Sequence, residues 1–112
     1  ITAKALQYLS KFGLNKEIYM KKLEIYSFAN CASRMNYVYD KYPYMEHFAN
    51  GEDFVARLGC NSCENVKKYI SIDGEIIINN KKSGHMFNSH YINDFINEYP
   101  QSRLISYVRN KN

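Results

Sequence analysis

The sequence of 112 residues contains no tryptophan and only three cysteines, two prolines and five glycines. Three cysteines are too few, and odd in number, for the disulfide framework of a small secreted domain, so at least one thiol stays free or pairs outside the chain. No stretch approaches the ~18 apolar residues of a membrane-spanning helix or the pattern of a signal peptide. Internal repeats and low-complexity linkers are also absent, so solenoid and linker-rich architectures are not expected.

The residues that are present suit one globular domain over residues 1–112. Apolar side chains make up 46% of the chain and aromatic side chains 15%, enough for a modest hydrophobic core. The net charge of +4 would suit an anionic partner such as RNA, a cell wall or an acidic immunity protein, but no basic run exceeds Lys-Lys. Because the chain opens with Ile1 rather than Met, we expect a processed or C-terminal piece of a longer protein.

Apolar spacing in the first half of the chain predicts helices and loops. The third helix has Asn30 as its N-cap, Cys31 in its first turn and Pro43 at its end. His47 lies among acidic residues and is expected on the surface or in a loop. The predicted helices cover residues 3–12, 15–28, 31–42 and 52–58 with a turn at 66–69, and loops cover 44–51 and 60–63.

From Tyr69 the apolar period changes to that of strands. The stretch YISIDGEIIINN predicts two strands separated by Asp73-Gly74, and the unbroken Ile76–Ile78 run predicts a strand buried on both faces. Two short strand pieces are predicted within 85–94 and a last strand over 104–109. Helices followed by strands predict an α+β fold, with N-terminal helices packed on a small antiparallel sheet.

Cys31 and His85 are the first pair that could carry chemistry. A helix N-terminus lowers the pKa of a cysteine, because its free N–H groups and its dipole favour the thiolate. A histidine near that thiol could stabilise the ion pair and then protonate a leaving amine. Either residue alone is more often structural.

The segments NCASRMNYVY, DGEIIINNKKSGHMF, HYINDF and LISYVR, in this order, resemble the NlpC-type and CHAP-type cysteine peptidases and amidases over about residues 26–109. The resemblance implies a papain-like fold, with Cys31 as nucleophile and His85 as general base. A third residue would orient the imidazole, with Asp94 as first choice and Asn93 and His90 behind it. The Cys31 N–H would be one oxyanion donor.

The same resemblance implies an activity and a setting. The substrate would be an amide bond in peptidoglycan peptides, and no cofactor would be needed. Wall-active members include bacterial effector and toxin domains, so secretion or delivery to a bacterial periplasm, and an acidic immunity protein as partner, are expected.

Two other interpretations remain open. Cys60-x-x-Cys63 together with His85 and His90 has the ligand types of a zinc site, but the spacing from Cys63 to His85 is not diagnostic of one, and a disulfide between the two cysteines or two simple thiols is preferred. A metal-free ribonuclease toxin would need only a base, an acid and cations for the phosphate. The residues available for that activity are His85, His90, Tyr91, Lys81 and Lys82.

Overall fold

Parallel strands form the centre of the protein in a computed structural model that describes residues 4, 8, 11, 16–36 and 41–111. The main sheet has the order β1-β3-β5, and a separate two-stranded ribbon pairs β2 with β4. The strands are β1 (Glu24–Phe28), β2 (Arg34–Met35), β3 (Tyr44–Asn50), β4 (Ser71–Ile72) and β5 (Glu75–Asn79). The fold is therefore α+β as predicted, but the predicted antiparallel sheet is wrong, because both sheets are parallel.

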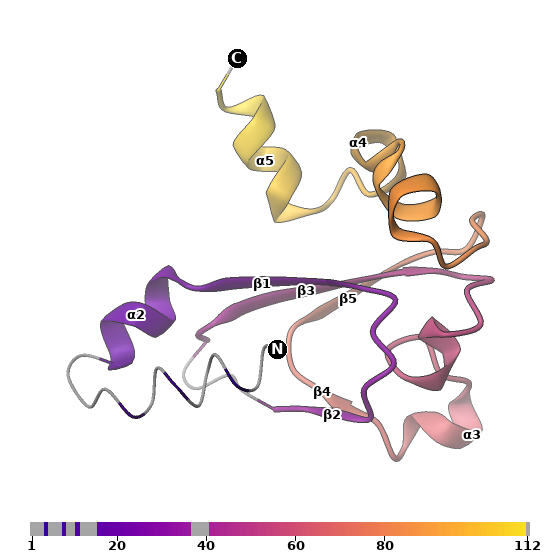
Figure 1. Ribbon diagram of the computed structural model, residues 1–112, viewed down its shortest axis with the longest axis horizontal. Coiled ribbons are helices and arrows are strands. Elements are labelled where there is room, and N and C mark those ends of the chain that lie inside the picture. Colours follow the sequence, from indigo (N-terminus) through magenta and orange to yellow (C-terminus); the bar gives the residue numbers. More distant parts are fainter. Residues whose placement is uncertain (1–3, 5–7, 9–10, 12–15, 37–40, 112) are drawn as a thin grey trace.

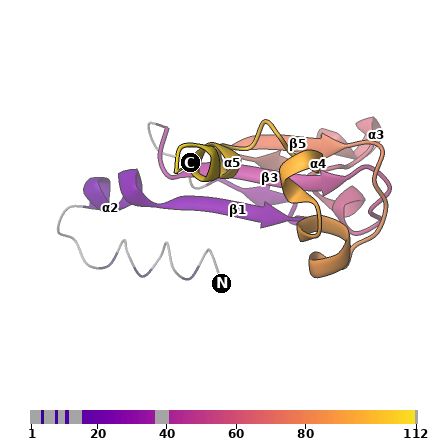
Figure 2. The same cartoon turned by 90° about the horizontal axis from the view of Figure 1, so that it is seen from above.

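Short helices surround the main sheet. They are α2 (Lys16–Lys22), the 3-10 helix η1 (Ala56–Leu58), α3 (Glu64–Lys67), the π-helix η2 (Phe87–Ile92), α4 (Phe95–Glu98) and α5 (Arg103–Arg109). Figures 1 and 2 show α4 and α5 over one face of the sheet, with the β2–β4 ribbon toward the other. No helix among the described residues is both long and apolar enough to span a bilayer.

The long connections explain why the strands run parallel. Residues 29–43 join β1 to β3, and residues 51–74 join β3 to β5. Parallel neighbours need such crossovers of a dozen or more residues, whereas a tight turn can join only antiparallel ones. The break at Asp73-Gly74, taken in the sequence as a separator of neighbouring strands, instead carries the chain from the ribbon (β4) into the main sheet (β5).

Strand β3 occupies residues that were predicted to form a loop. Its polar side chains are buried, and each has hydrogen-bond partners that offset its desolvation. Glu46 accepts from the Tyr44 and Ser102 hydroxyls and from the backbone N–H of Arg103, at 2.6 to 2.7 Å. His47 is fully buried rather than on the surface, because Ser27 and the carbonyl of Asp73 bracket its ring.

The predicted N-terminal helices are only partly right. Residues 4, 8 and 11 are helical, and the rest of the helix predicted over 3–12 lies outside the described residues. The second helix ends at Lys22, and the strand β1 follows it. Strand β1 carries Ile25, Tyr26 and Phe28, whose branched and aromatic side chains favour a strand that packs on a core.

The third predicted helix is wrong over residues 31–36, and residues 37–40 lie outside the described part of the chain. The Asn30 side chain does not cap a helix. Its Oδ1 accepts from the N–H of Ala32 at 2.9 Å, and the chain then runs extended into β2. A local side-chain bond of this kind gives the backbone an alternative to a helix. Cys31 consequently lies in a loop, without the helix N-terminus that was expected to activate its thiol.

The second half of the chain gives mixed results. The strands before and after Asp73-Gly74 are confirmed as β4 and β5, but only Ile77 of the isoleucine run is buried, whereas Ile76 and Ile78 are each 37% exposed. The strand pieces predicted over 85–94 are instead the π-helix η2, and the predicted last strand is α5. Ser102 begins α5 by accepting from the Leu104 N–H at 3.1 Å.

Aromatic side chains fill the core between the sheet and the helices after it. Phe48 on β3 stacks on Phe28 of β1 with ring centroids 5.0 Å apart, and it meets Phe95 and Tyr99 edge-on at 4.9 and 5.1 Å. Tyr91 of η2 meets Phe28 edge-on at 5.8 Å. These contacts tie η2 and α4 to the sheet, which fixes the segment that carries His85.

Candidate functional site

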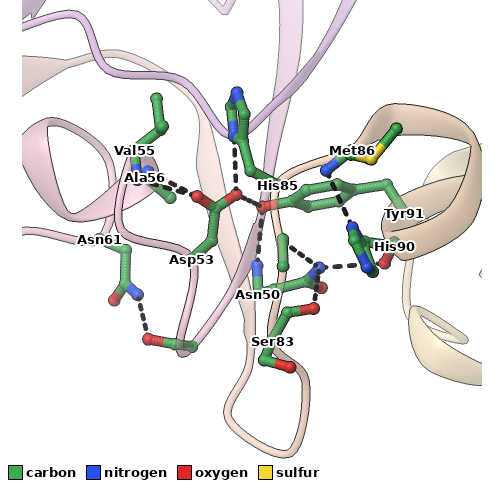
Figure 3. Close-up of polar contacts among 12 residues, drawn as sticks. Asn50, Asp53, Val55, Ala56, Asn61, Ser83, His85, Met86, His90 and Tyr91 are labelled. Atoms are coloured by element: carbon green, nitrogen blue, oxygen red, sulfur yellow. Dashed lines mark hydrogen bonds and ion pairs between the residues drawn. The ribbon is translucent and has the colours of Figure 1, made fainter.

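An aspartate and a histidine meet beyond the carboxyl ends of two neighbouring parallel strands. Asp53 follows the end of β3, and His85 follows the end of β5. The Nδ1 atom of His85 lies 3.2 Å from Oδ2 of Asp53 (Figure 3). In open parallel sheets this edge is where ligands bind, because the loops after the strands converge there.

Asp53 is fully buried, yet its carboxylate accepts four hydrogen bonds. The N–H groups of Val55 and Ala56 donate to Oδ1 at 2.9 and 3.3 Å, while the Tyr91 hydroxyl donates to Oδ2 at 2.5 Å alongside His85. Burial alone would raise the pKa of Asp53, but these hydrogen bonds outweigh burial and hold its pKa below the ordinary value. Asp53 is therefore a preformed carboxylate at neutral pH.

His85 has one nitrogen on the carboxylate and an accessible ring. Its side chain is 54% exposed, whereas that of Asp53 is 0% exposed. A carboxylate can only accept, so Nδ1 of His85 must carry the proton that is shared with Asp53. The neutral ring then has its lone pair on Nε2, which makes Nε2 the proton acceptor. The pair has the form of a carboxylate-oriented general base.

The loop that carries His85 is held at several points. The buried amide Nδ2 of Asn50 lies 3.4, 3.1 and 3.0 Å from the carbonyl oxygens of Ser83, Gly84 and His90. The Nδ1 atom of His90 accepts from the Met86 N–H at 3.0 Å. Figure 3 shows these contacts flanking the His85–Asp53 pair. Strand β3 thus anchors both the acid and the loop of the base.

Cys31, the predicted nucleophile, follows the end of β1 and is exposed. The Cys60 N–H donates to the carbonyl of Asn30 at 2.9 Å, and a Cβ on Gly59 would lie 2.6 Å from Cα of Cys31. The segment with Cys31 therefore packs against the chain just after η1, only a few residues beyond Asp53. Since β1, β3 and β5 are parallel, Cys31, Asp53 and His85 all follow strand ends at one edge of the sheet.

The structure gives Asp94, the acid chosen from the sequence, another partner. Asp94 is exposed, and its Oδ1 accepts from the Asn97 amide at 2.7 Å at the start of α4. Asp53, which the sequence did not single out, is the carboxylate that contacts His85. Its signal was an aspartate just after a strand and before a short helix, and the signal was missed because β3 was taken for a loop.

The cysteine pair gives no sign of a metal centre. All three cysteines are free thiols, with Cys60 buried and Cys63 exposed. In the part of the chain that the structure describes, no three or more His, Cys, Asp or Glu side chains gather as a metal ion would require. Burial raises the pKa of the Cys60 thiol to about 11. Cys60 belongs to the core cluster around Phe48.

Residues of the ribonuclease interpretation have structural partners. Tyr91 is fully buried on Asp53, and the His90 ring closes the loop of His85. The Lys82 ammonium is paired with the Glu98 carboxylate.

No family model matches the chain, and neither curated proteins nor solved structures gave a match. The functional argument therefore depends on the geometry of this site.

Proposed function

We propose that the protein is a hydrolase that cleaves an acyl bond with a nucleophile, a histidine and an acid, in which His85 is the general base and Asp53 the acid. The single observation that carries the proposal is the contact of 3.2 Å between an exposed imidazole and a fully buried, hydrogen-bonded carboxylate. Pairs of this kind hold the imidazole in one tautomer and stabilise the imidazolium that forms during the reaction.

The chain order supports this assignment. In hydrolases built on a parallel sheet, nucleophile, acid and histidine follow one another along the chain and lie beyond the carboxyl ends of strands. Cys31, Asp53 and His85 have this order and follow β1, β3 and β5. In papain-like enzymes the acid or amide follows the histidine, as Asp94 would. The parallel sheet and the acid before His85 favour the arrangement of the α/β-hydrolases over the papain-like one.

We propose Cys31 as the nucleophile. His85 Nε2 would take the proton from its thiol while the sulfur attacks the acyl carbon, and the imidazolium would then protonate the leaving amine or alkoxide. A water molecule, deprotonated by the same nitrogen, would then hydrolyse the thioacyl enzyme and release the carboxylic acid product. Throughout, the Asp53 carboxylate would keep the Nδ1 proton in place.

The proposed mechanism implies that the bond cleaved is an ester or an amide. The identity of the substrate is a separate proposal. Peptide amides of peptidoglycan are the first substrates to test, since the resemblance to wall-active cysteine amidases implies them. An acidic immunity protein that covers the same edge would fit a toxin of net charge +4. The ribonuclease interpretation has less support, because Tyr91, His90 and Lys82 are all engaged in structural contacts.

The test compares three single variants on chromogenic acyl esters, peptidoglycan peptides and RNA. We expect His85→Ala to lower ester or amide hydrolysis by about a thousandfold or more, and Cys31→Ala to do the same. Loss in His85→Ala with full activity in Cys31→Ala would assign the nucleophile to a residue other than Cys31. Lys81→Ala is the exposed control and should retain full hydrolysis. Cleavage of RNA alone, lost in His85→Ala, would refute the hydrolase.

A further inference from the structure

The hydroxyl of Tyr91 occupies a bridging position in the site. It lies 3.0 Å from the backbone nitrogen of Asn50 and 2.5 Å from Oδ2 of Asp53. Figure 3 shows the Tyr91 ring reaching from η2 to place its oxygen between the two groups. One side chain therefore links the end of β3, the acid and the segment that follows His85.

The direction of each hydrogen bond is fixed by chemistry. The Asn50 N–H can only donate, so the Tyr91 oxygen accepts from it, and the phenolic proton must point to Asp53, which can only accept. Two bonds in this head-to-tail order polarise one another in a buried site. The tyrosine hydroxyl is thereby fixed as a donor to the carboxylate.

The two oxygens of Asp53 have different partners. Backbone N–H groups of Val55 and Ala56 hold Oδ1, whereas Oδ2 is shared by Tyr91 and His85. With donors on both oxygens, the carboxylate cannot rotate about its Cβ–Cγ bond without losing hydrogen bonds. Oδ2 is the atom that has to stay opposite Nδ1 of His85, and the Tyr91 hydroxyl is the side-chain donor, besides His85 itself, that restrains it.

Packing does not require a hydroxyl at position 91. The ring is fully buried and meets Phe28 edge-on, as a phenylalanine ring would. Burying a phenolic oxygen costs free energy unless it is hydrogen-bonded, so a site that serves only the core would favour phenylalanine. The hydroxyl is explained by the two buried groups that it contacts, the Asn50 N–H and the Asp53 carboxylate.

We propose that Tyr91 is a positioning residue of the site, whose hydroxyl holds Asp53 Oδ2 opposite His85 and thereby keeps the neutral imidazole in the tautomer with the proton on Nδ1. This inference rests on the proposed function only for its effect on catalysis, because the tautomer can be measured without substrate. It assigns the hydroxyl no proton transfer with substrate.

The test uses Tyr91→Phe with Tyr99→Phe as matched control. The Tyr99 hydroxyl is also fully buried, and it donates to Oδ1 of Asn50 at 2.7 Å rather than to Asp53. Both variants keep an aromatic ring, but Tyr99→Phe loses the bond to Asn50 Oδ1, whereas Tyr91→Phe loses the bond to Asp53 and the one from the Asn50 N–H. Two-bond ¹H–¹⁵N correlation spectra of the imidazole, recorded where His85 is neutral, give the ratio of the Nδ1–H to the Nε2–H tautomer.

We expect the Nδ1–H form to dominate in the wild type and in Tyr99→Phe. In Tyr91→Phe, loss of the hydrogen bond to Asp53 should lower the ratio of the Nδ1–H to the Nε2–H tautomer about fivefold. In a hydrolysis assay kcat should fall by about tenfold in Tyr91→Phe with little change in KM, because a less restrained Asp53 also stabilises the imidazolium less in the transition state, whereas the substrate contacts are unaffected. An unchanged ratio in Tyr91→Phe, or an equal fall in Tyr99→Phe, would overturn the inference.

A second measurement needs no variant and keeps the inference testable if Tyr91→Phe does not fold. The Tyr91 hydroxyl proton of the wild type should give a downfield resonance protected from exchange with water, as a buried hydrogen bond to a carboxylate requires. A rapidly exchanging hydroxyl would overturn the inference. If the tautomer results hold but His85→Ala retains hydrolysis, the proposed function fails while the positioning role stands.

Discussion

Replacing Asp53 by asparagine should separate the acid that the structure indicates from the one that the sequence suggested. The carboxylate faces donors from Tyr91, His85, Val55 and Ala56. An asparagine offers one oxygen and one NH₂ group, so the NH₂ group has to face either the two backbone donors or the pair of side-chain donors. In each orientation at least one buried donor loses its acceptor.

The magnitude follows from these contacts. A hydrogen bond to a charged group contributes about 1.5–3 kcal/mol, and a buried group left unsatisfied costs about 1–3 kcal/mol. We therefore expect Asp53→Asn to lower the free energy of unfolding by about 3 kcal/mol. If the NH₂ group faces His85, it donates to Nδ1 and forces the proton onto Nε2, so the ring can no longer accept from the nucleophile. Hydrolysis should then fall by about 10³- to 10⁴-fold.

The control is Asp94→Asn. Asp94 is exposed, and the hydrogen bond of its side chain within the described residues is the one from the neighbouring Asn97 amide, so we expect less than about 0.5 kcal/mol of destabilisation and no loss of activity. Urea denaturation followed by circular dichroism gives the stabilities, and initial rates on an acyl ester give the activities. An Asp94→Asn enzyme that loses more activity than Asp53→Asn would refute the assignment.

Three further predictions concern other parts of the fold. Burial lowers the pKa of His47 in the folded protein below its unfolded value of 6.5, so the free energy of unfolding should fall as the pH drops below about 6.5. Urea titrations at pH 8 and pH 5 measure this fall, and it should be smaller in His47→Gln. Gly84→Ala should lower the free energy of unfolding by about 1–3 kcal/mol, because Gly84 has φ +89° and a Cβ would lie 2.5 Å from the His90 ring. An unchanged melting temperature would count against this packing. Because burial raises the pKa of the Cys60 thiol to about 11, iodoacetamide at pH 8 should modify Cys60 at least about tenfold more slowly than the exposed Cys63. Peptide mass mapping measures the two rates, and equal rates would disprove the burial of Cys60.

The sequence predicted those elements whose local signals agree with their surroundings. Strands β4 and β5 were found because branched residues flank Asp73-Gly74, a strong break. Strand β3 was missed because Glu46, His47 and Asn50 make it look like a loop. Their burial depends on partners far along the chain, such as Ser102 and Tyr99, which a local pattern cannot reveal.

Helix α5 was mistaken for a strand for the opposite reason. Its residues have branched and aromatic side chains that favour strands locally, but Ser102 caps a helix there, and Glu46 from the central strand accepts from its first N–H group. Of the candidate site, His85 was chosen for its chemistry and has a carboxylate partner in the structure. The partner was missed because β3 was taken for a loop, and Asp53 reaches His85 only through the parallel pairing of β3 with β5.

The most direct test of the central claim is chemical rescue of His85→Ala by added imidazole. Because the His85 side chain is 54% exposed, its removal should leave a space that small imidazoles can enter from solvent, beside an intact Asp53. We predict that His85→Ala hydrolyses an acyl ester at least about a thousandfold more slowly than the wild type, and that imidazole restores a saturable part of the rate, but not in the double variant with Asp53→Asn. Wild-type hydrolysis by His85→Ala without imidazole would contradict the claim that His85 is the general base.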